Sequence, residues 1–193
     1  MKKIYIVISL VLIFGALFYF LKNDNSTQVV HGDYKNTTYI IEGEPVSLQN
    51  GYAETSPVAG SAIKTITRYF GNEVKHDLND DGREDVVFLV TQEAGGTGIF
   101  VYAVAALNTP DGYVGSHAFF LGDRIAPQST VIDEGETSRG TTRKNVVVVN
   151  YAVRLPNEPF TAEPSLGKSV WLKLDPTTMQ FGEVEQNFEG ETR

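Results

Sequence analysis

Short apolar runs separated by turn residues make up most of this chain after residue 37, and they limit what it can fold into. The runs are rich in β-branched and aromatic residues, while Gly, Pro, Asn and Asp recur about every eight to twelve residues. No long amphipathic helix pattern interrupts them. The sequence therefore predicts a mainly β fold, either an antiparallel sandwich or a partly closed barrel. The expected strands are 39–41, 46–48, 63–70, 86–92, 99–107, 113–121, 128–133, 146–154, 170–174 and 180–184.

The N-terminus has a different character from the rest of the chain. Lys2 and Lys3 precede an unbroken apolar run over residues 4–21, which as a helix would be about 27 Å long, close to the thickness of a bilayer core. The run is longer than the apolar part of a cleaved signal peptide, and it ends in bulky aromatics where a signal peptidase needs small residues. We expect one transmembrane helix that acts as an uncleaved signal anchor. Cleavage, which would release a secreted protein, is the alternative.

The expected organisation follows from these two patterns. Residues 1–22 form the anchor, residues 23–36 a polar stalk, residues 37–185 an extracytoplasmic β-domain, and residues 186–193 a frayed tail. The basic N-terminus predicts that the anchor crosses the cell membrane once, with the C-terminal domain outside the cytoplasm.

The net charge and the absence of cysteine limit the kinds of partner that the chain can be expected to bind. The chain has a formal net charge of −8, and Lys2, Lys3 and Lys22 all lie at the anchor, so the β-domain is more acidic still. Nucleic-acid binding needs clustered Lys and Arg, and the sequence has no such cluster. There is no cysteine, which excludes a lipoprotein anchor and disulfides. The lipid bilayer, through residues 4–21, and an unidentified envelope protein or glycan remain as expected partners.

One motif carries identifiable chemistry, and it lies directly before the apolar run that starts at Val86. Oxygen-bearing side chains recur at alternate positions, a glycine permits a sharp bend at Gly82, and a further carboxylate closes the set. Such alternation lets a curled backbone direct each oxygen inward onto one calcium ion. The predicted ligands are Asp77, Asn79, Asp81, the main-chain carbonyl of Arg83, and Asp85. An acidic turn that binds no metal is the alternative.

The motif is not an EF-hand. Position twelve, where an EF-hand has a bidentate glutamate, is the apolar Phe88, and a strand is expected to follow instead of a helix. The spacing resembles the calcium loops of integrin-type FG-GAP repeats. A propeller of such repeats is excluded, because the motif occurs once and the chain has strands for two blades at most.

A wider stretch extends the resemblance. Residues 67–73, the loop itself, and residues 121–127 together resemble a family of uncharacterised bacterial exported proteins that have a single loop of this kind after an N-terminal export segment. The resemblance implies a location outside the cytoplasm and a calcium ion. It implies no activity.

No constellation of catalytic residues stands out in the sequence. There is no nucleophile elbow, no glycine-rich phosphate loop, and no spacing of His31, His76 and His117 that would suit a transition metal. The sequence therefore favours a membrane-anchored binding or interaction module with one structural calcium ion. The alternative is a cell-envelope hydrolase that uses acidic residues near the metal loop.

Overall fold

A computed structural model describes residues 32–56, 63–135 and 144–184. The predicted transmembrane helix and frayed tail lie outside these ranges, as does His31. Within them, no helix is long and apolar enough to cross a membrane. The single helical element of the described ranges is a 3₁₀ turn, η1 (Tyr34–Asn36), which is capped by the carboxylate of Asp33.

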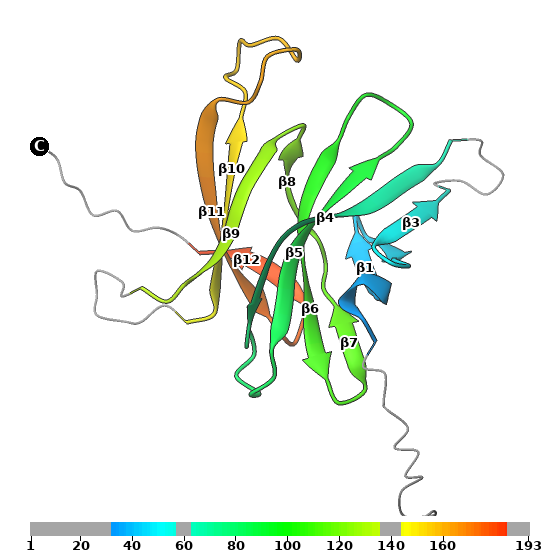
Figure 1. The fold of residues 1–193 in the computed structure, drawn as a ribbon, viewed down its shortest axis with the longest axis vertical. Helices are drawn as coiled ribbons and strands as arrows, with labels where there is room; N and C mark the ends of the chain where they lie inside the picture. Colours follow the sequence, from blue (N-terminus) through cyan, green and yellow to red (C-terminus); the bar gives the residue numbers. More distant parts are fainter. Residues whose placement is uncertain (1–31, 57–62, 136–143, 185–193) are drawn as a thin grey trace, which may run out of the picture. The chain divides into compact units, whose positions relative to one another are not determined.

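Twelve strands are found in the described residues (Figure 1). Their bounds are β1 (Thr38–Ile41), β2 (Glu44–Ser47), β3 (Tyr52–Thr55), β4 (Thr65–His76), β5 (Asp85–Glu93), β6 (Phe100–Thr109), β7 (Gly112–Gly115), β8 (Phe119–Asp123), β9 (Ala126–Asp133), β10 (Val146–Val153), β11 (Leu166–Asp175) and β12 (Gln180–Glu183).

These strands form three antiparallel groups. One sheet has the order β3-β4-β5-β6-β7, with β8 also paired to β6; a second has the order β12-β11-β10-β9; and β1 and β2 form a hairpin. The prediction of a mainly β, antiparallel fold is confirmed. The described sheets are not closed into a barrel.

Strand β5 is buried on both faces, which explains its continuous apolar run. Val87 and Leu89 belong to one core together with side chains of β10 and β11. Val86, Phe88 and Val90 face the opposite way, into a second core with the β1–β2 hairpin. Because successive side chains of a strand point to opposite faces, a strand between two cores must be apolar at every position.

Aromatic rings surround the centre of the second core. Phe88 is fully buried, and its ring centroid lies 5.5 Å from Tyr34, 5.5 Å from Tyr39 and 5.3 Å from Tyr69. Tyr34 precedes residue 37, so the domain includes the last residues of the segment expected to be a stalk.

Two local expectations were wrong. The strand expected to end at residue 70 continues to His76 as β4, and Gly71 and Asn72 form a bulge inside it, with φ angles of 111° and 49° and a register shift against β5. The run 113–121 is two strands, β7 and β8, separated by a segment that contains the buried Ser116. The hydroxyl of Ser116 accepts the N–H of Ala105 at 2.8 Å and so interrupts the strand.

Candidate metal centre

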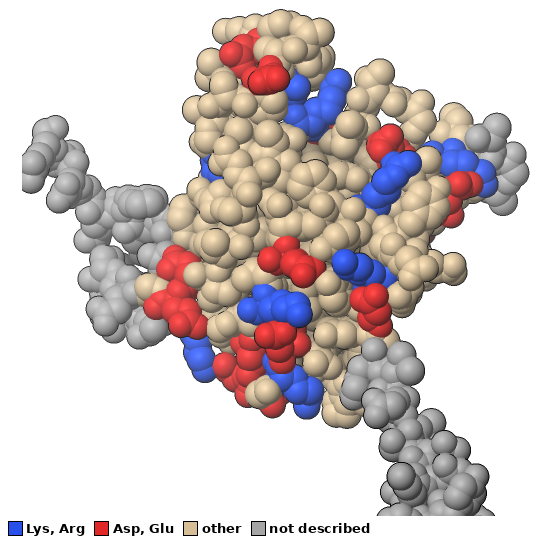
Figure 2. All heavy atoms as spheres, in the orientation of Figure 1, with Lys and Arg blue, Asp and Glu red and all other residues tan. Residues whose placement is uncertain are grey.

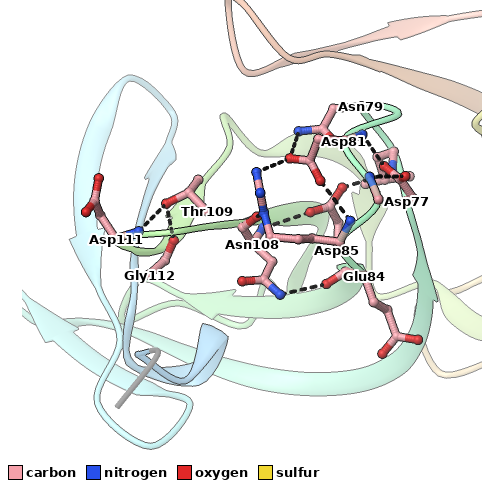
Figure 3. Close-up of polar contacts among 12 residues, drawn as sticks. Asp77, Asn79, Asp81, Glu84, Asp85, Asn108, Thr109, Asp111 and Gly112 are labelled. Atoms are coloured by element: carbon pink, nitrogen blue, oxygen red, sulfur yellow. Dashed lines mark hydrogen bonds and ion pairs between the residues drawn. The ribbon is translucent and has the colours of Figure 1, made fainter. Parts of the chain in front are cut away.

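The predicted metal loop connects β4 to β5, and Asp85 fixes it to the domain. Asp85 is the first residue of β5 and is fully buried. One carboxylate oxygen accepts the N–H of Leu78 at 2.9 Å, and the other accepts the N–H of Asn108, at the end of β6, at 2.7 Å (Figure 3). Leu78 itself is buried in the core between the two sheets. The two ends of the loop are thereby tied to each other and to β6.

The loop is curled by its own side chains. The carboxylate of Asp77 accepts the N–H of Asp81 at 3.1 Å and that of Gly82 at 2.7 Å. Asn79 also accepts the N–H of Asp81, at 3.2 Å, and Asp81 accepts the N–H of Arg83 at 2.9 Å. Gly82 has a φ angle of 84°, which permits the bend expected at the sixth position.

Arg83 differs from the expectation that only its carbonyl would take part. Its Nε donates to the carbonyl of Asn108 at 2.6 Å, and its Nη2 pairs with Oδ2 of Asp81. The physical reason is that several carboxylates lie close together on this loop and attract the nearest cation. The guanidinium therefore stabilises Asp81 in the way that a bound cation would.

Charges of both signs alternate around the loop. Asp80 and Glu84 are exposed; Asp80 pairs with Lys144 at 2.6 Å and Glu84 with Lys75 at 3.5 Å. In the space-filling view, acidic and basic side chains lie side by side around this end of β4 and β5 (Figure 2). Ion pairs this exposed contribute little stability each, so they compensate the acidic charge without holding the loop in place.

Buried polar groups from a distant segment support the loop from beneath. Asn145, just before β10, is buried and donates its Nδ2–H to the carbonyl of Leu78 at 3.1 Å. Its Oδ1 lies 3.2 Å from Nε2 of His76. Neither Asn145 nor Asn108 was predicted from the sequence to support the loop. A signal existed only for Asn108, which begins an Asn-Thr-Pro-Asp-Gly turn.

The pKa shifts of the loop carboxyl groups differ in sign. Burial raises the pKa of Asp85, and the charges of Asp81 and Asp77 add to this effect, while two accepted N–H bonds oppose it. The pKa of Asp81 is lowered, first by the accepted N–H of Arg83. Asp85 is thus a buried carboxylate that a divalent cation would stabilise in its ionised form.

The residues present fit calcium in their donor chemistry: three carboxylates, one amide oxygen and one carbonyl. They do not converge in the described arrangement, since among residues 32–56, 63–135 and 144–184 no three His, Cys, Asp or Glu side chains stand close enough to hold a metal ion. The guanidinium of Arg83 occupies Oδ2 of Asp81, so a cation bound through that oxygen would compete with Arg83.

Asp123 and Arg124 form an ion pair with a closest distance of 2.6 Å, and Asp123 accepts the N–H of Ile99 at 2.9 Å. His76 and His117 belong to separate environments.

No protein-family model, curated protein or solved structure matches this chain. The resemblance to FG-GAP loops and to the exported family stays a prediction.

Proposed function

We propose that this chain is a membrane-anchored, extracytoplasmic binding or interaction module whose loop at residues 77–85 binds one structural calcium ion. The observation that carries the calcium proposal is the curl of the loop. Asp77, at position one, accepts the N–H groups of positions five and six, and Gly82 supplies the bend. A loop that is already curled needs little ordering when it binds an ion.

The membrane location rests on the sequence. The apolar run 4–21 behind two lysines supports a single-pass signal anchor, and the acidic domain that follows suits an environment rich in divalent cations. The finer fold proposal is an antiparallel sandwich, supported by the core that the β5–β6 and β10–β11 strand pairs share.

A structural role suits the loop better than acid–base catalysis. Every carboxylate oxygen of Asp77 and Asp85 already accepts a main-chain N–H. A general acid or base needs a carboxyl group that faces a substrate within hydrogen-bonding reach. Asp85 is fully buried, so the hydrolase alternative receives no support from it.

Thermal unfolding in calcium and in chelator tests the calcium proposal. Extracellular calcium modules bind with dissociation constants of about 0.1–1 mM, so about 10 mM calcium should stabilise the folded chain by about 1.4–2.7 kcal/mol. For a domain of this size, the melting temperature should rise by about 3–10 °C. The variant Asp81→Ala should lose this shift while melting near the wild type in chelator.

The matched control is Asp111→Ala, in the turn between β6 and β7. Its side chain is exposed and lies outside the loop, so the calcium shift should persist. Magnesium at the same concentration should shift the wild type less, because it demands tighter octahedral geometry. Identical wild-type curves in calcium and chelator would refute the calcium proposal.

A further inference from the structure

Strands β2 and β3 begin as a tight hairpin and then separate. Gln49 and Tyr52 exchange two main-chain hydrogen bonds of 2.8 and 3.1 Å around a turn with φ angles of 50° at Asn50 and 78° at Gly51. Beyond this pair the strands part, since β2 pairs with β1 and β3 pairs with β4. Each is left with one edge turned toward the other.

A groove lies between the two edges. It consists of one cavity of about 410 Å³ near the turn between β2 and β3, and another of about 420 Å³ near the tip of the β1–β2 hairpin. Both are lined by Pro45 and Thr55. The cavity near the turn is lined by Ser47 on β2, by Gln49 after it, and by Glu54 on β3. Glu42 and Glu44 line the other cavity.

Main-chain groups of both strands face this groove. In an antiparallel pair, hydrogen bonds to the partner come from alternate residues. Leu48 donates to Thr37 at 3.0 Å, so the N–H and C=O of its neighbour Ser47 point away from β1. Gly51 accepts the N–H of Tyr69 on β4 at 2.6 Å, so by the same alternation the main chain of Glu54 points away from β4. The gap can therefore pair with an extended segment on both sides.

The charges at the groove favour a basic occupant. Glu44 is exposed, and within the described part of the chain it has no hydrogen-bond or ion-pair partner, while Glu42 accepts a hydrogen bond only from the hydroxyl of Tyr102, at 3.0 Å. Lys64 and Arg68, on the segment that runs into β4, are already engaged, since Lys64 lies 3.7 Å from Glu54 and Arg68 lies 2.6 Å from Glu93.

A second copy of this chain suits the groove poorly. It would bring the same glutamates to the same edges, and acidic residues with a proline are how sheet edges avoid pairing with themselves. Pro45 removes one N–H from β2 without closing the groove to a partner. An oppositely charged strand, by contrast, gains from the carboxylates.

We propose that the groove between β2 and β3 binds an extended peptide segment with Lys or Arg at alternate positions, which is added as a strand. This inference gives the proposed interaction module its binding surface and so rests on that role, but it does not depend on calcium at residues 77–85. Main-chain pairing would supply affinity, and Glu42 and Glu44 would select the basic side chains.

Selection from a displayed library of random nonapeptides, on the full chain in mild detergent, tests the proposal. Enriched peptides should carry Lys or Arg at alternate positions. Fluorescence anisotropy with the best peptide should show that Glu44→Lys weakens binding by about tenfold or more. Glu163→Lys, an exposed position in the connection between β10 and β11, changes the net charge equally and should weaken binding less than twofold.

Two further measurements separate strand addition from simple charge attraction. N-methylation of alternate residues keeps the charges of the peptide but removes N–H donors, so binding should be lost. Ser47→Pro removes an outward N–H of β2 and should weaken binding while the melting curve stays intact. Failure to enrich basic peptides, equal effects of the two charge reversals, or unchanged binding of the N-methylated peptide would each overturn the proposal.

The calcium melting shift, measured on Glu44→Lys, separates this proposal from the one before it. If the groove is wrong, the shift persists and the module must use another surface. If the calcium loop is wrong, the shift is absent in the wild type while peptide binding remains.

Discussion

The two ends of strand β5 are held in opposite ways. Before the strand, the loop at residues 77–84 is shaped by its own side chains, and Asp85 anchors it beneath the surface. After the strand, the glycine-rich connection at residues 94–99 is mostly exposed, and Ile99 is held from outside, by Asp123 and by the N–H of Arg124. The loop before β5 is therefore held by its own side chains, whereas the connection after β5 is held by residues of the β8–β9 turn.

The difference shows where a ligand site can be preformed. A loop whose carboxylates accept its own N–H groups keeps its curl without help, and the same oxygens have further lone pairs for a cation. A connection built from Gly95, Gly96 and Gly98 has no side chains there to direct. Its shape depends on the β8–β9 turn instead, so we expect it to follow movements of that turn.

The largest expected effect comes from removing the carboxylate that holds each connection, Asp85 before β5 and Asp123 after it. Asp85→Ala leaves the N–H groups of Leu78 and Asn108 without their acceptor, at about 1–3 kcal/mol each, and relieves the burial of a carboxylate. We expect a net loss of about 2–4 kcal/mol in urea unfolding with chelator present. Asp123→Ala removes one capped N–H and a partly exposed ion pair, and should cost about 1 kcal/mol.

Equal losses from the two substitutions would break the comparison. Asp111→Ala serves here as the reference for removing an exposed aspartate, and should stay within about 0.5 kcal/mol of the wild type.

Much of the fold could be predicted because burial leaves a clear pattern. The unbroken apolar run in β5 predicted a buried strand, and the structure adds that two cores cover it. The bulge in β4 could not be predicted, because Gly71-Asn72 is as typical of a turn as of a bulge. Strand β3 was missed because it is four residues long and buries only Ala53 on its inner face.

The loop shows the same division between local and distant information. The positions of Asp77, Asn79, Asp81 and Gly82 follow from their spacing, since the bonds that curl the loop join residues at most five apart. The supporting contacts of Asn145 and Asn108 join segments 67 and 23 residues away. The tertiary fold alone brings those together.

A smaller test compares one glycine from each end. Gly82 has a φ of 84° with nothing within 4 Å of an added Cβ, so Gly82→Ala meets only backbone strain, about 1–2 kcal/mol. Gly96 also has open space but no positive φ. Gly96→Ala should therefore be neutral or stabilise by up to about 1 kcal/mol, through the unfolded chain.

Urea unfolding of both variants measures this difference. If Gly96→Ala lowers the free energy of unfolding as much as Gly82→Ala does, the backbone of the connection at residues 94–99 is as strictly constrained as that of the loop at residues 77–84.

The smallest expected effect is a dependence on pH, because the pKa values of Asp85 and Asp123 are shifted in opposite directions. Hydrogen bonds from the Arg124 guanidinium hold the pKa of Asp123 below its usual range, so its contribution is present above the unfolded pKa of about 3.9 and is lost as the pH falls through the folded pKa. The stability difference between wild type and Asp123→Asn, at most about 1 kcal/mol, should therefore shrink below about pH 4.

Asp85 should show the reverse in chelator. Because burial raises its pKa, the folded state binds its proton first, and the wild type gains stability as the pH falls from the folded pKa toward about 3.9. The unfolding free energy of the wild type minus that of Asp85→Asn should therefore increase as the pH falls toward about 4. This change should come at higher pH than the decrease expected for Asp123. If both differences shrink together over one pH range, burial does not distinguish the two carboxylates, and the loop is not anchored from beneath in the way that its hydrogen bonds indicate.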